Sequence, residues 1–162
     1  FEDVKSAAYE VRDVLGAAGL TTFVLLTGGK GLHVIAPLER RQGWDEVKAA
    51  SRGLAKKLSE AAPDIYVAEA SKAKRKGRIF IDWLRNERGA TAVCPYSLRA
   101  RPGAPVATPV RWDELAGISS GHDYTLSNIR RRLSSLKSDP WEGYDDVRQS
   151  ISKSVLSVLA DD

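Results

Sequence analysis

Residues 22–35 read TFVLLTGGKGLHVI, two short apolar runs separated by a glycine-rich loop. The runs Thr22–Leu26 and Leu32–Ile35 are rich in β-branched and large apolar residues, which favours strands. The loop Thr27–Gly31 between them is short and contains three glycines, so it can turn the chain back on itself. This stretch therefore predicts a pair of adjacent strands joined by a hairpin-like, glycine-lined turn.

The sequence on either side of this hairpin alternates between helical and extended patterns. Apolar residues at helical spacing predict helices over 4–20, 44–61, 126–136 and 144–159, with a further short helix starting in 112–115. Short strands are expected over 65–68, 78–84 and 90–97, and the three prolines of 102–109 favour an extended covering loop. The pattern is not a regular βαβ alternation. It predicts an α+β fold, with a mixed, mainly antiparallel sheet flanked by helices.

Composition limits the function classes. The 162 residues suit one domain or a large piece of one, and no run of 18 apolar residues is present, so we expect a soluble, cytoplasmic protein with no membrane partner. The sequence holds no methionine, from which we expect a fragment or a processed piece. A single cysteine and two histidines exclude an internal disulfide and a structural zinc site. We expect Cys94 to be an inert thiol in a buried strand.

The positive charge is concentrated in one window. The formal net charge is +4, yet residues 72–111 contain ten lysines and arginines against two acidic residues. Such a field favours polyanions, either nucleic acid or nucleoside triphosphates. A solvated basic loop without a ligand is the competing interpretation, and charge alone does not separate the two.

The glycine-rich loop is the first candidate site. Its backbone N–H groups can point at phosphate oxygens, Lys30 adds a positive charge, and Thr27 and His33 offer hydrogen bonds. His33 alternates with Leu32 and Val34, so its side chain is expected on the opposite face of the strand. The loop is not a Walker A motif, because Gly-Lys is not followed by Ser or Thr. A glycine-rich turn without a function remains open.

The second and third candidates are an acidic and a basic position. Asp82 lies within the apolar run 78–84, where burial requires a cation, either an arginine such as Arg99 or Arg101 or a metal ion. Two-metal phosphoryl chemistry requires at least two converging carboxylates, and this window supplies one. Arg99 and Arg101 point to one face of an extended chain and match a triphosphate, although two ordinary surface arginines would have the same spacing.

The remaining polar and aromatic residues have structural interpretations. His122, in the sequence Ser-Gly-His-Asp-Tyr, is typical of a turn before a helix. The four tryptophans open helices or lie in a strand, and we interpret them mainly as core anchors. Trp83 could alternatively stack on a base.

Three of these segments in fixed order closely resemble the polymerase domain of bacterial ligase D, a member of the archaeo-eukaryotic primase superfamily. They are TGGKGLHV at 27–34, RIFIDWLRN at 78–86, and GATAVCPYSLRARPGAP at 89–105. PVRWDEL at 109–115 and DPW at 139–141 continue the likeness, which covers nearly the whole chain.

The resemblance implies a role for each motif residue. Asp82 is similar to the family's third metal-binding carboxylate, and His33 to the histidine that contacts the phosphates of the incoming nucleotide. Thr27, Lys30 and Gly31 match the loop that faces the triphosphate, and Arg99 and Arg101 match arginines that neutralise it. The family uses Mn²⁺ or Mg²⁺ to add nucleotides, often ribonucleotides, to DNA 3′ ends at breaks, beside a ligase domain and the Ku end-binding protein. A bacterial cytoplasmic, nucleoid-associated location follows from this.

The sequence departs from the family in one respect. The family's first metal motif, Asp-x-Asp, precedes the helix that is predicted here over 4–20, and residues 1–162 contain no such pair ahead of it. We therefore expect residues 1–162 to be the C-terminal portion of a primase-polymerase domain, inactive or nearly so when isolated. A non-catalytic module that binds nucleotides or nucleic acid is the alternative, and a purely structural fragment is the third interpretation.

Overall fold

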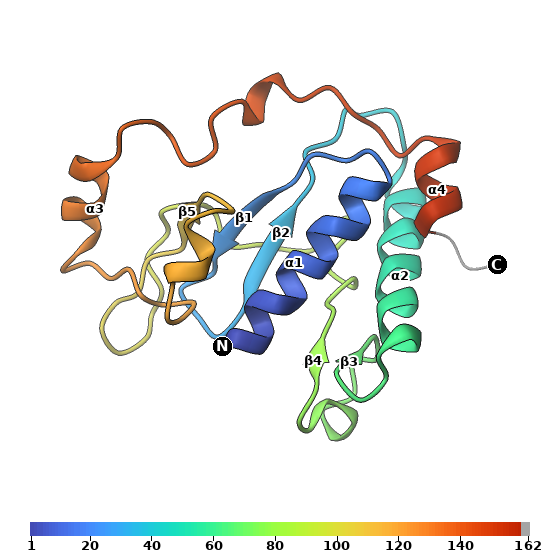
Figure 1. The fold of residues 1–162 in the computed structure, drawn as a ribbon, viewed down its shortest axis with the longest axis horizontal. Coiled ribbons are helices and arrows are strands. Elements are labelled where there is room, and N and C mark those ends of the chain that lie inside the picture. The colour runs from blue at the N-terminus through green and yellow to red at the C-terminus, as the bar shows by residue number, and fades with distance from the viewer. Residues whose placement is uncertain (160–162) are drawn as a thin grey trace. The chain divides into compact units, whose positions relative to one another are not determined.

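The computed structural model describes residues 1–159, and α-helices, short strands and 3₁₀ turns alternate along them (Figure 1). The α-helices are α1 (Glu2–Ala17), α2 (Trp44–Ala61), α3 (Ile129–Ser135) and α4 (Lys153–Leu159). The strands are β1 (Phe23–Leu26), β2 (Leu32–Ile35), β3 (Tyr66–Val67), β4 (Ile79–Phe80) and β5 (Thr108–Val110). The 3₁₀ turns are η1 (Ala73–Arg75), η2 (Leu115–Gly117) and η3 (Tyr144–Asp146). These elements confirm the expected α+β fold class.

The chain packs into two compact units, each made of segments that are distant in the sequence. Unit 1 comprises Phe1–Arg12, Thr21–Pro37 and Val93–Val147. Unit 2 comprises Asp13–Leu20, Leu38–Ala92 and the chain from Arg148 onward. The glycine-rich loop and the two candidate arginines therefore belong to unit 1, and Asp82 belongs to unit 2.

Unit 1 is built on a three-stranded antiparallel sheet in the order β2-β1-β5. The predicted hairpin is confirmed, with Val24 opposite Val34 and Leu25 opposite His33. On its other side β1 pairs with β5, where Leu25 lies opposite Pro109. Because residues opposite each other in a ladder share a face, Leu25, His33 and Pro109 lie on one face of the sheet.

The other face of this sheet forms the core of unit 1. The side chains that pack there come from β1, β5, α1 and the β5–α3 connection. The buried cluster consists of Ala8, Val24, Leu26, Val110, Leu115 and Ile118, and the partly buried residues at its edge are Phe1, Tyr9, Leu32, Val34, Trp112 and Tyr124. Each large aliphatic side chain buried in this way contributes about 1.5–3 kcal/mol of hydrophobic free energy. The core fixes the strand ends, and with them the glycine-rich loop.

An ion pair between the buried Arg132 and the partly buried Glu114 ties α3 to the edge of this sheet. Arg132 Nη1 lies 3.0 Å from Glu114 Oε1 and donates to the Tyr124 hydroxyl, and Arg132 Nη2 donates to the Pro109 carbonyl at 3.0 Å. The Arg132 side chain is only 7% exposed.

Burial and the charge of Asp139 raise the pKa of the nearby Tyr96 phenol, against the opposing charge of Arg132, so the phenol stays protonated at neutral pH.

Unit 2 is organised around α2, whose bounds match the predicted helix. The helix begins where the Gly43 N–H donates to the Glu46 carboxylate at 2.8 Å, and it ends before Pro63. Its apolar side packs against β3 and α4. Beside it, β3 and β4 form a short parallel pair, in which Tyr66 lies opposite Ile79.

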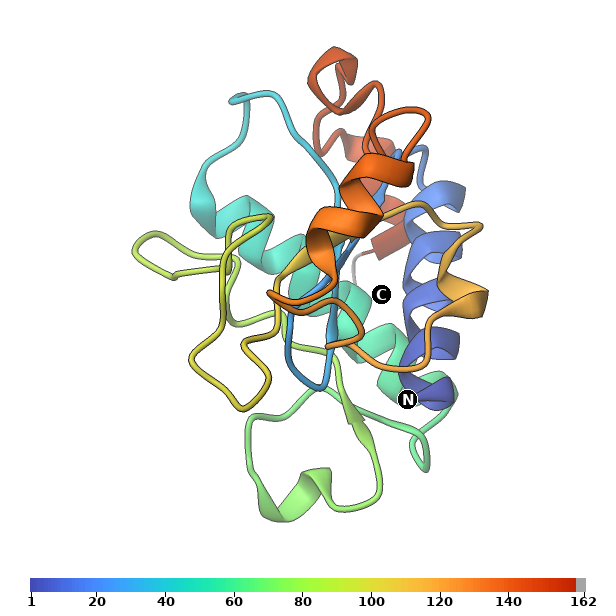
Figure 2. The same cartoon turned by 90° about the vertical axis from the view of Figure 1, so that its left-hand side faces the viewer.

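Two predicted segments have a different structure in unit 1. Residues 90–97 form no strand, because Pro95 interrupts the run and Tyr96 adopts a φ of +63°, which an extended strand does not allow. Residues 81–104 contain no helix or strand. Figure 2 draws the yellow-green and yellow part of the chain as loops. Cys94 is exposed, so its prediction as a core thiol is wrong. Conversely, the end of the covering loop predicted over 102–109 belongs to strand β5 (Thr108–Val110). Pro109 is tolerated there because β5 lies at the edge of the sheet.

Unit 2 also differs from prediction in two places. The strand expected over 78–84 is limited to Ile79–Phe80, since the chain turns at Trp83, whose N–H donates to the Ile81 carbonyl. The helix expected over 144–159 is split into η3 and α4, because residues near Gln149 are extended and bind the segment around Glu39. Trp44 is 54% exposed, so it opens α2 without serving as a core anchor.

The single sheet that we expected is replaced by two separate ones among the described residues, one in each unit.

No helix in residues 1–159 combines the length and the apolar character needed to cross a membrane.

The Glu114–Arg132 pair predicts a pH dependence of stability. Burial alone would raise the pKa of Glu114, but hydrogen bonds from Arg132 and the Arg111 N–H, with the charge of Arg132, hold it below its usual value. A depressed folded-state pKa contributes stability above the unfolded pKa, and this contribution disappears as pH falls through the folded value. The free energy of unfolding of the wild type should therefore fall more steeply below about pH 4.5 than that of Glu114→Gln, as measured by urea titration.

Asp113→Asn provides the matched control, since Asp113 is also a carboxylate paired with an arginine but is 76% exposed. Its stability curve should run parallel to that of the wild type. Parallel curves for Glu114→Gln would show that the buried carboxylate makes no net contribution.

Candidate functional site

The glycine-rich loop is held in shape by its first and last residues. The Thr27 hydroxyl donates to the Gly31 carbonyl at 2.8 Å, and the Thr27 N–H donates to the same oxygen at 3.4 Å. The Thr27 side chain, which we predicted to bind a triphosphate, therefore closes the loop. Gly28 and Gly29 are buried within it, whereas Lys30 is exposed at its tip.

The structure brings both predicted arginines to this loop. Backbone hydrogen bonds between residues 96–99 and 105–107 carry them there, and Arg99 Nη1 donates to the Thr27 carbonyl at 3.0 Å. The Arg101 guanidinium lies on Gly29, where a Cβ would be 3.7 Å from its central carbon. Two guanidinium groups and the glycine loop thus form one positively charged surface, which we call the glycine-loop site, comprising Thr27–Gly31, Arg99 and Arg101.

The donors of this site are largely unused by the protein. Within residues 1–159, the backbone N–H groups of Gly28, Gly29 and Lys30 make no hydrogen bond, and neither does the Arg101 guanidinium. Successive free N–H groups in a glycine loop form a concave site for an anion, and guanidinium groups match phosphate oxygens in geometry and charge. The arrangement is therefore suited chemically to a phosphate or polyphosphate group.

His33 lies on β2, two residues after the loop, and is half-buried. Its position on the sheet face opposite Val24 and Val34 confirms the face that its alternation predicted. Its role in contacting phosphate stays a prediction.

Asp82 has a different environment from the one that the sequence predicted. It follows the end of β4, its side chain is 39% exposed, and it forms an ion pair with Arg85 at 3.2 Å. The interpretation of a carboxylate buried in a strand is therefore wrong, and its partner is Arg85, where we had named Arg99 and Arg101. A common site for Asp82 and Thr27 stays a prediction, since they belong to different units.

The described residues do not form a metal centre by themselves. Across residues 1–159, no cluster of three or more histidine, cysteine, aspartate or glutamate side chains could hold a metal ion. The role of Asp82 as a metal ligand stays a prediction.

Sequence reasoning missed a second layer behind the glycine loop. Residues 119–123, Ser-Ser-Gly-His-Asp, press against it from another side, and we call them the bracing loop. A Cβ at Gly121 would be 2.7 Å from the Gly29 carbonyl oxygen and 2.9 Å from that of Gly31. The available signal was a glycine between polar residues, which also suits an ordinary turn.

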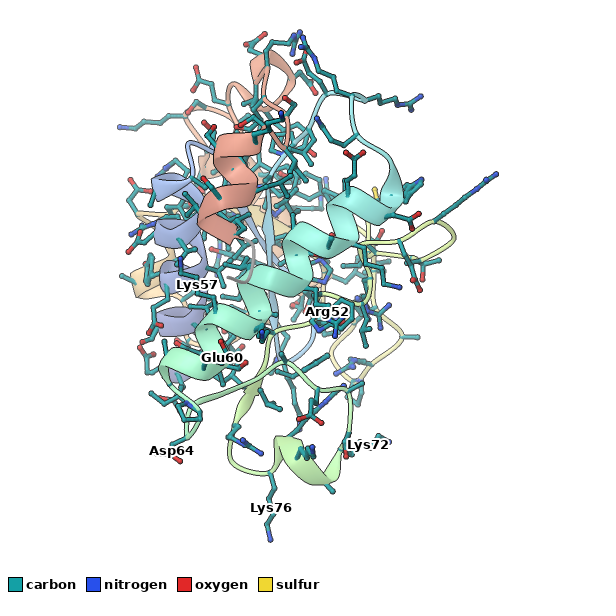
Figure 3. All side chains as sticks on the ribbon, turned by 90° about the vertical axis from the view of Figure 1, so that its right-hand side faces the viewer. Arg52, Lys57, Glu60, Asp64, Lys72 and Lys76 are labelled. Atoms are coloured by element: carbon teal, nitrogen blue, oxygen red, sulfur yellow. The ribbon has the colours of Figure 1, made fainter. Side chains whose placement is uncertain are left out.

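The loop at 71–78 of unit 2, which precedes Asp82, contains a cluster of lysines and arginines. Lys72 and Lys76 extend from it, with Lys76 pointing away from the ribbon (Figure 3). Arg75 instead stacks on Phe80, with its guanidinium carbon 3.6 Å from the ring centre. The exposed lysines present positive charge that a polyanion could reach.

Comparisons with known proteins decide the family. The model of the family described as "LigD, primase-polymerase domain" matches residues 1–141. The chain belongs to this family. It is 41% identical over 147 residues to the multifunctional non-homologous end joining protein LigD of Pseudomonas aeruginosa, covering 90% of this chain and 18% of that protein. The bifunctional LigD of Bacillus subtilis is 27% identical over 128 residues, covering 78% of this chain and 21% of that protein.

A solved member of the family has the same fold. The polymerase domain of Mycobacterium tuberculosis ligase D, in complex with DNA, superposes with a TM-score of 0.80 at 30% identity. The match covers 90% of this chain and 50% of that one. The chain therefore spans half of this structure and less than a quarter of the curated relatives. These matches place it in a DNA end-joining primase-polymerase family.

Gly28 is expected to tolerate no side chain. Its φ is +66°, and a Cβ would lie 2.6 Å from Arg99 Cγ, well inside van der Waals contact. Gly28→Ala should therefore lower the free energy of unfolding by about 1–3 kcal/mol, as measured by urea denaturation. Gly31→Ala is the control, because nothing lies within 4 Å of its Cβ position. Equal stabilities of the two variants would show that Arg99 does not pack on Gly28 in solution.

Proposed function

We propose that this chain is part of a nucleotidyltransferase that adds nucleotides, including ribonucleotides, to DNA 3′ ends during end joining. The primer 3′-hydroxyl attacks the α-phosphate of a nucleoside triphosphate in line, and pyrophosphate leaves. The single observation that carries this proposal is the glycine-loop site, with unused N–H groups of Gly28–Lys30 beside Arg99 and Arg101. Membership of the primase-polymerase family supports it.

The glycine-loop site would bind the triphosphate. Free backbone N–H groups and the Lys30 and Arg101 side chains donate to phosphate oxygens, and Thr27 and Gly31 keep the loop in the receiving shape. Arg99 uses one donor on the Thr27 carbonyl and has others for the ligand. His33 contacts the phosphates from β2. These groups are fixed before the ligand arrives, so they stabilise charge on the leaving pyrophosphate with little reorganisation.

The metal role is assigned to Asp82 alone among the described residues. Mn²⁺ or Mg²⁺ would activate the attacking oxygen and screen the phosphates. Asp82 and its neighbours do not suffice to hold such an ion, because this carboxylate pairs with Arg85 and residues 1–159 contain no cluster of three or more metal-binding side chains. We therefore propose that residues 1–162 are the C-terminal portion of the domain, that Asp82 joins carboxylates supplied by other parts of it, and that residues 1–162 do not polymerise alone.

DNA ends are the proposed macromolecular partner. The exposed lysines at 72 and 76 supply a positive surface for the DNA backbone. A ligase domain and Ku are proposed partners on the basis of the family. The absence of a metal-ligand cluster in residues 1–159 favours one alternative, a non-catalytic module that binds nucleotides or DNA.

Triphosphate binding tests the glycine-loop site directly. Residues 1–162 should bind ATP in calorimetric titrations, and Arg101→Gln should weaken that binding by about tenfold or more, the equivalent of one charge-assisted hydrogen bond. Arg111→Gln is a matched control, because Arg111 is an exposed arginine of the same unit that pairs with Asp113. Equal affinities of the two variants would remove Arg101 from the site, and no ATP binding by the wild type would remove the site itself.

Primer extension separates the enzyme from the binding module. Residues 1–162 would be fused behind the preceding part of the Pseudomonas polymerase domain and assayed with Mn²⁺ and a primed DNA end. We expect extension by the fusion, none by residues 1–162 alone, and a loss of about a hundredfold or more in Asp82→Asn. Glu87→Gln, a nearby acid paired with Lys48, should retain activity. Full activity of Asp82→Asn would exclude Asp82 as a metal ligand.

A further inference from the structure

The peptide groups of the glycine loop are oriented through their carbonyl oxygens. In a trans peptide the C=O and the following N–H lie in one plane and point in opposite directions. Holding the Thr27 carbonyl thus fixes the direction of the Gly28 N–H, and Arg99 holds that carbonyl at 3.0 Å. A peptide plane next to a glycine can rotate unless a hydrogen bond or a close contact fixes it, since glycine accepts both signs of φ.

Another of the free donors, the Lys30 N–H, shares its plane with the Gly29 carbonyl. That carbonyl is 3.3 Å from His122 Nδ1. A carbonyl oxygen only accepts, so the contact is a hydrogen bond when the imidazole carries its proton on Nδ1. Gly121 lies directly behind, where even a Cβ would be 2.7 Å from the same oxygen. The bracing loop therefore both blocks and binds the Gly29 carbonyl.

The bracing loop is itself rigidly fixed. The Asp123 carboxylate accepts from the Ser119 N–H at 2.7 Å and from the Ser120 hydroxyl at 2.6 Å. The Asn128 amide donates to the Asp123 carbonyl at 2.9 Å, which links the loop to the start of α3. Ile118, just before the loop, is buried in the unit 1 core. His122 is thus presented to the glycine loop from a framework that is anchored at both ends.

We propose that His122 is a positioning residue that fixes the Gly29–Lys30 peptide plane, and so directs the Lys30 N–H to the phosphate that the glycine loop binds. This proposal rests on the proposed function. Without the Nδ1 donor, the plane can rotate and turn the electronegative Gly29 oxygen toward the phosphate in place of the N–H. His122 itself does not contact the nucleotide in this assignment.

A matched pair of substitutions tests the hydrogen bond apart from the bulk of the side chain. Asparagine places an amide donor where Nδ1 lies, and leucine has the same branched shape without a donor. With inorganic triphosphate as the probe, His122→Leu should bind about three- to tenfold more weakly than the wild type, the effect of one lost hydrogen bond, and His122→Asn within about twofold. Equal affinities of the two variants would overturn the proposal.

Nuclear magnetic resonance gives a readout that a merely structural role would not change. The ¹⁵N shifts of the imidazole should show His122 protonated on Nδ1, and the Lys30 amide signal should move in His122→Leu and return in His122→Asn. An Nε2-protonated neutral ring, or an unmoved Lys30 signal, would overturn the proposal. If wild-type residues 1–162 do not bind triphosphate, the proposed function fails, while the tautomer and the Lys30 signal still decide whether His122 holds the peptide.

Discussion

The close packing of Arg99 against Gly28 is the constraint on which the glycine-loop site depends. No side chain fits between the loop backbone and Arg99 Cγ, so the arginine stem defines the path of the loop while its head binds the Thr27 carbonyl. On another side, Gly121 approaches the Gly29 and Gly31 carbonyls equally closely. The loop is therefore enclosed by close contacts on two sides.

Much of unit 1 could be predicted because its signals are local. The strand–glycine–strand pattern of 22–35 predicted both strands and their pairing. In unit 2, the helical pattern likewise predicted α2 at its observed bounds. The meeting of Arg99 with Thr27 was implied by the family resemblance, since nothing in the spacing of residues 72 positions apart predicts contact.

Two of the failures share a physical cause, the satisfaction of backbone groups by distant partners. Residues 90–97 alternate like a strand, but Tyr96 donates its N–H to the Ala107 carbonyl with a positive φ, which ends any ladder. Residues 148–151 resemble a helix, yet the Gln149 carbonyl accepts from the Glu39 N–H. The bracing loop was missed for the same reason. Its importance comes from the contacts of Gly121 and His122 with the glycine-rich loop. The local sequence around these two residues does not predict those contacts.

Pro109 and Arg132 together affect how the sheet edge meets other molecules. β5 is the outer strand of its sheet, and an outer strand normally offers donors and acceptors on which a foreign strand can assemble. At its centre Pro109 has no N–H to offer, and its carbonyl is already taken by Arg132. This edge of the sheet is therefore closed to intermolecular β-pairing, which protects it against edge-to-edge aggregation.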